Sequence, residues 1–489
     1  MRPLEWVLVV GAAMLLWGWA AGWRVGRLVS AGLGALLVGH LFLEGQRMMM
    51  WPVYLIIGVA GLVSLGGERP RRPPGGRWRA LGRWTIALTL LTLFVPLPWL
   101  WPVMRLPKPA GPFSVGTSWL TVTDSTRRER FGPAAAVRAF PVKVWYPAAP
   151  GTSGTLAPYS AAEEPTFGAI PAAMFRQLAL VKTHSLLSVP IAPDPARFPV
   201  IIFSHGYGGY PAQNTPQMEE LASQGYVVLS IGHPGEAGAV SFPDGRLVMM
   251  DSALLAVLKQ SASGPGASKA LAAMSRADSA RTAPDRRDAW RAIIAATPEP
   301  LRSLSLVEWA ADTKALVDRL EQMNRDGAGA LFAGRLDLER LGIAGMSYGG
   351  ATAGEFCRVD RRCKAGFNLD GGQYGGLIDD SLTVPFFILA SEQAYAVHRP
   401  VLDVLKGPAF LVRVPKTNHL GLTDMALMAP VLYRWSGVTG RLDPSRREAI
   451  MTRYLVGFFD SYLKGQHSPW LDGPPSSEPD LSFETGKPQ

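Results

Sequence analysis

The chain has 489 residues, of which 48% are hydrophobic, and a formal net charge of +10. This length exceeds one ordinary core and predicts two or three structural units. Most of the excess charge lies in residues 1–109, which carry 11 Arg and 1 Lys against 3 Glu, while the rest of the chain is almost neutral. A nucleic-acid-binding protein needs its basic residues on the folded domain, so the sequence argues against nucleic acid as a partner.

Four apolar segments fill the front of the chain, at residues 4–23, 28–43, 48–66 and 84–104. A membrane-spanning helix needs about 20 apolar residues, and aromatic residues near the ends of such segments are typical of membrane interfaces. A single cleavable signal peptide would account for the first segment but not for the next three. The sequence therefore predicts an all-α transmembrane region of about four helices over residues 1–104, and hence a membrane-integral protein.

The loop at residues 67–83 contains six Arg. Loops of this composition stay on the cytoplasmic side, so the fourth segment delivers the chain after about residue 105 to the opposite face. For a bacterial protein, this predicts a multi-pass inner-membrane location with the C-terminal domain in the periplasm or outside the cell. The two cysteines, Cys357 and Cys363, either pair in such a compartment or stay as free thiols, and the sequence leaves both options open.

A Pro-rich linker at residues 105–113 precedes a region in which strands and helices alternate. Segments 118–124 and 140–147 alternate in polarity, as half-buried strands do. Six later segments are continuous apolar runs, which are typical of parallel strands buried on both faces; they lie at 198–206, 226–235, 341–350, 364–372, 384–392 and 409–419. With a helix predicted over 305–323, they predict an α/β fold with a mostly parallel, doubly wound sheet over residues 114–467.

Two stretches depart from this alternation. Residues 245–304 are rich in Ala, Ser and Arg and predict a helical insertion, which either forms a lid over the site or is a surface excursion. Residues 468–489 are rich in Pro and Ser, which predicts a flexible tail.

The segment Gly345-Met346-Ser347-Tyr348-Gly349 has the Gly-x-Ser-x-Gly spacing of a nucleophile elbow, and it joins a predicted strand to a helix. A serine hydroxyl needs a base within hydrogen-bond reach and an acid that orients this base. His419 directly follows the last apolar strand and comes after Ser347 and the candidate acids, so we predict that it is the base. His398, in the segment YAVHRP, is predicted to lie at the surface or at a pocket rim.

Two carboxylates are candidates for the acid, because Asp370 and Glu392 each end a predicted strand. We favour Asp370 and keep Glu392 as the alternative. The oxyanion of the transition state needs hydrogen-bond donors, and the backbone amides of Tyr207 and Tyr348 are the candidates. His205 precedes Tyr207 in the segment FSHGYGG, and we predict a structural role for it, with its ring holding this loop by a hydrogen bond.

With these motifs assembled, the chain resembles the plasma-type platelet-activating factor acetylhydrolase family, whose members are α/β-hydrolase esterases related to dienelactone hydrolases. The resemblance covers about residues 111–465 and rests on GPFSVGTSWLTVTD, FPVKVWYPA, FPVIIFSHGYGG, GMSYGGAT, NLDGG and NHLGLTD. It implies Ser347 as nucleophile, Asp370 as acid and His419 as base, with the amides of Tyr207 and Tyr348 as oxyanion donors. The four apolar segments and the insertion are not part of that family's pattern.

The expected function is that of a membrane-anchored serine ester hydrolase of the carboxylesterase or phospholipase A2-like type. It would act through an acyl-enzyme on a small-molecule ester, for which a lipid would suit the bilayer surface. This chemistry requires no metal and no organic cofactor. Two alternatives stay open: an acyltransferase that uses the same site, and a non-catalytic membrane scaffold on a hydrolase fold.

Overall fold

The computed structural model describes residues 1–23, 26–65, 76–131, 136–160, 175–263, 265–326 and 331–486. The chain separates into two compact units. Unit 1 comprises Met1–Arg105, Ala169–Val181 and Leu427–Leu432, and unit 2 comprises Leu106–Gly168, Lys182–Ala426 and Tyr433–Gln489. Most of the arginine-rich loop that predicts the membrane orientation, residues 66–75, lies outside the described residues.

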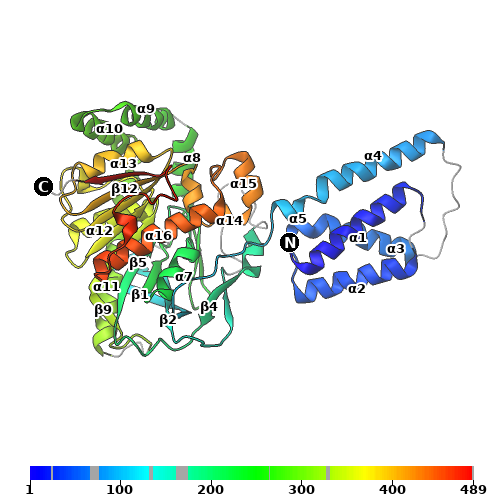
Figure 1. Ribbon diagram of the computed structural model, residues 1–489, viewed down its shortest axis with the longest axis horizontal. Coiled ribbons are helices and arrows are strands. Elements are labelled where there is room, and N and C mark those ends of the chain that lie inside the picture. The colour runs from blue at the N-terminus through cyan, green and yellow to red at the C-terminus, as the bar shows by residue number, and fades with distance from the viewer. Residues whose placement is uncertain are drawn as a thin grey trace. The chain divides into compact units, whose positions relative to one another are not determined.

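Unit 1 is built from apolar helices (Figure 1). They are α1 (Pro3–Ala20), α2 (Arg27–Leu43), α3 (Trp51–Leu65), α4 (Arg77–Phe94) and the short α5 (Leu97–Leu100), with 3-10 turns η1 (Met48–Met50) and η2 (Arg176–Leu180). Leu8 and Ala12 of α1 pack with Val53 and Ile57 of α3 in a small core. The apolar segments of the sequence therefore form helices that pack on one another.

Two helical stretches among the described residues, Pro3–Ala20 and Arg77–Leu100, are long and apolar enough to cross a membrane. The stretches Arg27–Leu43 and Met48–Ser64 are apolar but shorter. By length and composition alone, two of the four predicted segments therefore meet the requirement for a membrane span. Membrane crossing by these helices stays a prediction.

Unit 2 contains an 11-stranded sheet in the order β13-β12-β11-β10-β9-β5-β6-β2-β1-β4-β3. Its strands are β1 (Ser114–Arg128), β2 (Val137–Ala148), β3 (Leu156–Pro158), β4 (Lys182–Leu187), β5 (Phe198–Ser204), β6 (Val227–Ile231), β9 (Leu336–Met346), β10 (Ala365–Leu369), β11 (Phe386–Ser391), β12 (Ala409–Val414) and β13 (Ser482–Gly486). The strands from β6 to β12 in this order are parallel, whereas β2 pairs antiparallel with β6 and β13 with β12. This mostly parallel sheet fits the predicted α/β-hydrolase fold.

Side chains of the parallel strands fill two cores on opposite faces of the sheet. On β5, Val200 and Ile202 belong to one core, and Ile201 and Phe203 belong to the other. Helices α11 (Leu306–Asp326) and α12 (Tyr348–Val359) contribute to the first core, and α7 (Thr215–Ser223) and α16 (Pro444–Leu463) to the second. Because both faces are covered, the central strands are apolar at nearly every position.

The stretch at residues 245–304 is mainly helical in its described residues. It contains α8 (Ser252–Ser263), α9 (Pro265–Ser279), α10 (Ala283–Ala296) and a π-helical turn, η3 (Pro300–Ser305), which leads directly into α11. The hairpin of β7 (Ala239–Ser241) and β8 (Leu247–Met249) overlaps its start. The remaining helical segments are α13 (Tyr395–Leu402), α14 (Met425–Met428), α15 (Pro430–Ser436), η4 (Gly376–Ile378), η5 (His419–Leu422) and η6 (Pro469–Leu471).

The C-terminal tail differs from the prediction of a flexible segment. Its strand β13 pairs with β12 from Ala409 opposite Gly486 to Arg413 opposite Ser482. Phe483 also packs against the second core. Composition did not reveal this strand because an edge strand is held largely by main-chain hydrogen bonds, which Pro and Ser content does not report.

The two cysteines form a disulfide. Cys357, near the end of α12, is bonded to Cys363, in the turn before β10. Of the two options that the sequence left open, the structure contains the paired form.

Candidate active site

Ser347 lies on the tight turn between β9 and α12 and has φ 55° and ψ −117°. A non-glycine residue rarely adopts such a conformation, and it is characteristic of the serine in a nucleophile elbow. A Cβ on Gly345 would lie 2.1 Å from the carbonyl carbon of Gly349, and a Cβ on Gly349 would lie 1.9 Å from the carbonyl oxygen of Ser204. The backbone passes so closely at both positions that only glycine fits, which explains the motif.

The structure brings Ser347, His419 and Asp370 together. Nε2 of His419 lies 2.9 Å from Oγ of Ser347, and Nδ1 of the same ring lies 2.8 Å from Oδ2 of Asp370. Ser347 follows β9, Asp370 follows β10 and His419 follows β12. Because the carboxyl ends of parallel strands meet at one edge of a sheet, three residues that are distant in sequence converge there.

His398 occupies a place that the sequence did not predict. It is buried on α13, and its Nε2 lies 3.3 Å from Oδ1 of Asp370. The prediction of a surface or rim position for His398 was therefore wrong. The segment is too short and too mixed in polarity to show which face of α13 packs inward.

The carboxylate of Asp370 is held from several sides. Oδ1 also accepts a hydrogen bond from the amide of Ser391 at 2.8 Å. Burial by itself would raise the pKa of Asp370, but hydrogen bonds from His398 and His419 outweigh burial and hold it well below its usual range. Asp370 is therefore ionised and can stabilise a positive imidazole.

The imidazole of His419 joins this buried acid to the solvent-facing side of the site. Its side chain is 42% exposed, whereas that of Asp370 is fully buried. Desolvation lowers the pKa of His419, but the hydrogen bond and the charge of Asp370 outweigh it, so the net shift is upward. Because the His419 ring is partly exposed and bonded to a buried carboxylate, it can exchange protons with a bound substrate or water.

Glu392, the alternative acid, lies elsewhere. It is exposed, and its Oε2 accepts a hydrogen bond from the amide of Lys416 at 3.0 Å. The Nδ1 atom of His419 is bonded to Asp370 instead. The geometry therefore favours Asp370 over Glu392, although both follow strands at the same edge of the sheet.

The loop after β5 lies directly against Ser347. A Cβ on Gly206 would be 3.3 Å from Cβ of Ser347. The residue after Gly206 is Tyr207, and Tyr348 is the first residue of α12, where a backbone amide has no partner within the helix. The backbone at both positions is thus next to the serine, as donors to an oxyanion must be.

His205 lies in this loop, and its ring bonds to the loop backbone. Its ring is buried, and Nδ1 donates to the carbonyl oxygen of Gly206 at 2.7 Å. Burial and the neighbouring His233 lower the pKa of His205 to about 3. The ring is therefore neutral, and its hydrogen bond to Gly206 stabilises the loop.

His233 and Asp312 form a buried polar group next to this loop, which the sequence did not predict. His233 donates from Nδ1 to Oδ2 of Asp312 at 2.9 Å, and its Nε2 lies 3.2 Å from Oγ of Ser204 at the end of β5. Asp312 also binds Arg138 at 2.6 Å and Arg127 at 2.8 Å. Burial would raise the pKa of Asp312, but Arg138 and the other donors outweigh it and hold it low. One available signal was the position of His233 two residues after the apolar strand β6.

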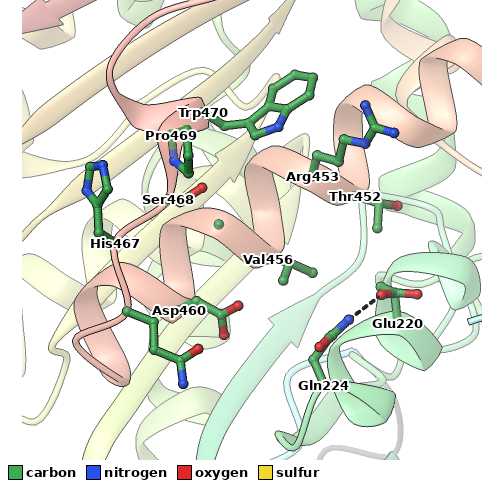
Figure 2. Close-up of a pocket in the computed structure, with 12 residues that line it drawn as sticks. Glu220, Gln224, Thr452, Arg453, Val456, Asp460, His467, Ser468, Pro469 and Trp470 are labelled. Carbon is green, nitrogen blue, oxygen red and sulfur yellow. Dashed lines mark hydrogen bonds between the residues drawn. The ribbon is translucent and has the colours of Figure 1, made fainter. Parts of the chain in front are cut away.

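A cavity of about 300 Å³ lies between α7, α16 and the tail (Figure 2). Glu220, Asp460, His467 and Trp470 are among the residues that line it. Inside it, Gln224 donates to Glu220 at 2.8 Å, the bond drawn as a dashed line in Figure 2. None of the three converging residues lines this cavity, so it is separate from the candidate site.

Comparisons with known proteins agree with this fold. Residues 101–247 match the model of a family described as platelet-activating factor acetylhydrolase, isoform II. The match spans the early strands and the loop after β5 but ends before Ser347. In structure, the chain is similar to a ferulic acid esterase from Streptomyces cinnamoneus, with a TM-score of 0.59 and 26% sequence identity, over 78% of this chain and 99% of the esterase.

The fold and these likenesses define the class of the protein. The chain is an ester-hydrolysing enzyme with an α/β-hydrolase fold, of the type that cleaves carboxylic esters. The predicted likeness to platelet-activating factor acetylhydrolases is supported over residues 101–247.

Proposed function

We propose that the protein is a membrane-anchored serine ester hydrolase that acts through Ser347, His419, Asp370 and an acyl-enzyme. The observation that carries the proposal is the continuous contact from Ser347 Oγ through the His419 ring to Asp370, at 2.9 and 2.8 Å. Both distances are those of hydrogen bonds, so the serine is paired with a base and the base with an acid.

The geometry supports the following reaction. His419 takes the proton of Ser347 as Oγ attacks the ester carbonyl, and the amides of Tyr207 and Tyr348 bind the developing oxyanion. Asp370 keeps the imidazole in the required tautomer and stabilises its positive form. Collapse of the tetrahedral intermediate expels the alcohol, which takes the proton from His419. Water, deprotonated by His419, then attacks the acyl-enzyme, and the acid is released as Ser347 Oγ leaves and takes this proton from His419.

The substrate that we propose is a small-molecule carboxylic ester, with a lipid-like ester as the favoured class. The family description names a platelet-activating factor acetylhydrolase, whereas the similar structure is by its title a ferulic acid esterase. These names point to acyl groups of different size and shape. The acyl preference is therefore the property to measure.

The test combines turnover with covalent labelling. The full chain, purified in detergent, is expected to hydrolyse p-nitrophenyl esters and to react with a fluorophosphonate at one serine, Ser347, as mapped by peptide mass spectrometry. A series from acetyl to palmitoyl esters would distinguish a short-acyl esterase from a lipase. Labelling at another serine, or turnover that survives full labelling, would contradict the proposed nucleophile.

The rate should depend on the protonation of His419. The hydrogen bond and charge of Asp370 raise the pKa of His419 above its usual 6.5. Because only the neutral ring can accept the serine proton, kcat/KM should be low in acid and rise through a midpoint above pH 6.5. The measurement is kcat/KM for p-nitrophenyl acetate at constant ionic strength, from about pH 5 to pH 9. A flat profile, or a midpoint well below 6.5, would contradict His419 as the base.

Membrane attachment and export are further parts of the proposal. Two stretches of unit 1 are long enough to span a membrane, and its helices expose large apolar side chains, including Trp6, Trp17, Leu28, Leu55, Leu62 and Trp78. The Cys357–Cys363 disulfide suits a periplasmic or extracellular location for unit 2. The protein should stay in the bacterial membrane pellet after alkaline carbonate washing, and a protease added to spheroplasts should degrade unit 2. Release into the wash would contradict anchoring, and full protection from the protease would contradict export.

A further inference from the structure

Trp309 lies at the centre of a buried aromatic cluster between the two backbone segments next to Ser347. Its indole is fully buried on the first turn of α11. It stacks on His233 with ring centroids 3.7 Å apart, and its other ring neighbours are His205 at 5.1 Å, Tyr207 at 5.9 Å and Tyr348 at 4.9 Å. One side chain therefore contacts the loop after β5, the loop after β6 and the start of α12.

A hydrogen bond fixes the orientation of this indole. Nε1 of Trp309 donates to Oε2 of Glu236 at 2.9 Å. The backbone carbonyl of Glu236 in turn accepts a hydrogen bond from the amide of Gly208 at 3.0 Å. Trp309 is thus connected through Glu236 to the residue that follows Tyr207, in addition to its direct packing on the Tyr207 ring.

The same face of α11 supports the end of β5. Asp312, three residues after Trp309, binds His233, which reaches Oγ of Ser204. Arg138 forms an ion pair with Asp312, which balances the negative charge of this buried carboxylate. The loop that carries Tyr207 is therefore contacted by His233 where it leaves β5. Trp309 packs on the rings of its residues His205 and Tyr207.

The other proposed donor segment, the start of α12, contacts the end of the helical insertion. The hydroxyl of Tyr348 donates to the carbonyl oxygen of Leu301 in η3, and its ring lies edge-on to those of Trp309 and Tyr207. The turn η3 ends where α11 begins, and π-helical turns of this kind are frequent at functional sites. The end of the insertion thus packs into the cluster centred on Trp309.

We infer that Trp309 is a positioning residue of the oxyanion site, which fixes the backbone at Tyr207 and Tyr348 relative to one another. The inference rests on the proposed function, because it takes these two amides as the oxyanion donors. The donors are far apart in sequence, so no local turn sets their spacing, and the structure supplies a shared packing partner instead. A displacement of about 1 Å in such a site can cost about 100-fold in rate.

The test compares two conservative tryptophan variants of the full chain. Trp309→Phe removes the indole N–H and part of the contact area. Trp145→Phe makes the same change at an equally buried tryptophan on β2, in the core on the other face of the sheet. For p-nitrophenyl acetate, Trp309→Phe should lower kcat by about 10- to 100-fold with little change in KM, whereas Trp145→Phe should retain the parent kcat.

Inhibition by an aryl trifluoromethyl ketone supplies a readout that a purely structural role would not change. Its serine adduct carries an oxyanion, so its inhibition constant should rise in Trp309→Phe by about the same factor as kcat falls. Equal kcat losses in both tryptophan variants, or a loss confined to KM, would overturn the inference. A parent chain that hydrolyses no ester would instead contradict the proposed function itself.

Two variants of Glu236 keep the inference testable if Trp309→Phe does not fold. Glu236→Gln retains an acceptor oxygen for the indole N–H, whereas Glu236→Met removes it. Glu236→Met should lose more kcat than Glu236→Gln, at a similar melting temperature. Equal rates in the two variants would overturn the role assigned to the orientation of Trp309.

Discussion

Replacing Ser347 with Ala is expected to lower kcat for a p-nitrophenyl ester by about 10,000- to 1,000,000-fold. The substitution removes the attacking oxygen and leaves His419 without a proton to accept, so no acyl-enzyme can form. A residual rate above that of water should persist, because the oxyanion donors and the binding surface stay in place. KM should change little, since the hydroxyl acts mainly in the transition state.

The matched control is Ser461→Ala. Ser461 lies on α16, where its hydroxyl bonds to the carbonyl oxygen of Gly457 at 2.9 Å, and it is not among the residues of the site. This variant should keep the parent rate. A Ser347→Ala protein that hydrolyses as fast as the parent would exclude this serine as the nucleophile. Product analysis with an added alcohol would show whether the acyl group passes to water or to the alcohol.

The candidate site illustrates which features a sequence can reveal. Gly345, Ser347 and Gly349 form a local motif, and the close backbone approaches that require its glycines lie within one strand-to-helix turn or reach the adjacent strand. His419 could be predicted because it follows a strand whose apolar character shows that it is buried. In both cases the candidate residue lies at a strand end, where parallel strands of this fold converge.

The parts that escaped prediction depend on contacts between distant elements. His398 reaches Asp370 only because α13 presents one particular face to the sheet, and no periodicity is readable in so short a helix. Trp309 and Asp312 belong to a helix that was predicted, but their burial against side chains of the loops that follow β5 and β6 depends on how that helix packs on the sheet. Apolar periodicity marks Trp309 as a core residue and carries no information about its neighbours.

The N-terminal segments show a different limit. Composition predicts that they are apolar helices, and unit 1 consists of such helices in the described residues. The helices differ in length, because two stretches reach membrane-spanning length and two are shorter. A short apolar helix that packs on its neighbours also occurs in proteins without a membrane, so composition alone cannot decide the number of spans.

Asp370→Asn is expected to lower kcat by about 10,000-fold, whereas Glu392→Gln should leave it unchanged. An amide at position 370 cannot supply the negative charge that stabilises the imidazolium, and its N–H₂ group can hold the His419 ring in the wrong tautomer. The same change removes the charge that raises the pKa of His419, so the acid limb of kcat/KM should move to lower pH. Both effects follow from the 2.8 Å contact between Nδ1 of His419 and Oδ2 of Asp370.

The two carboxylates make this comparison decisive, because each ends a strand at the same edge of the sheet and each substitution is isosteric. Glu392 is exposed and binds only a backbone amide among its described hydrogen bonds, so its neutralisation should affect neither the rate nor the pH profile. Melting temperatures of both variants would separate catalysis from stability, since Asp370 is buried and its loss also weakens the bonds to Ser391 and His398. A large rate loss in Glu392→Gln with near-normal turnover in Asp370→Asn would transfer the acid role to Glu392. It would also mean that the contact between Asp370 and His419 is structural, with the working ring turned toward the neighbouring strand end during catalysis.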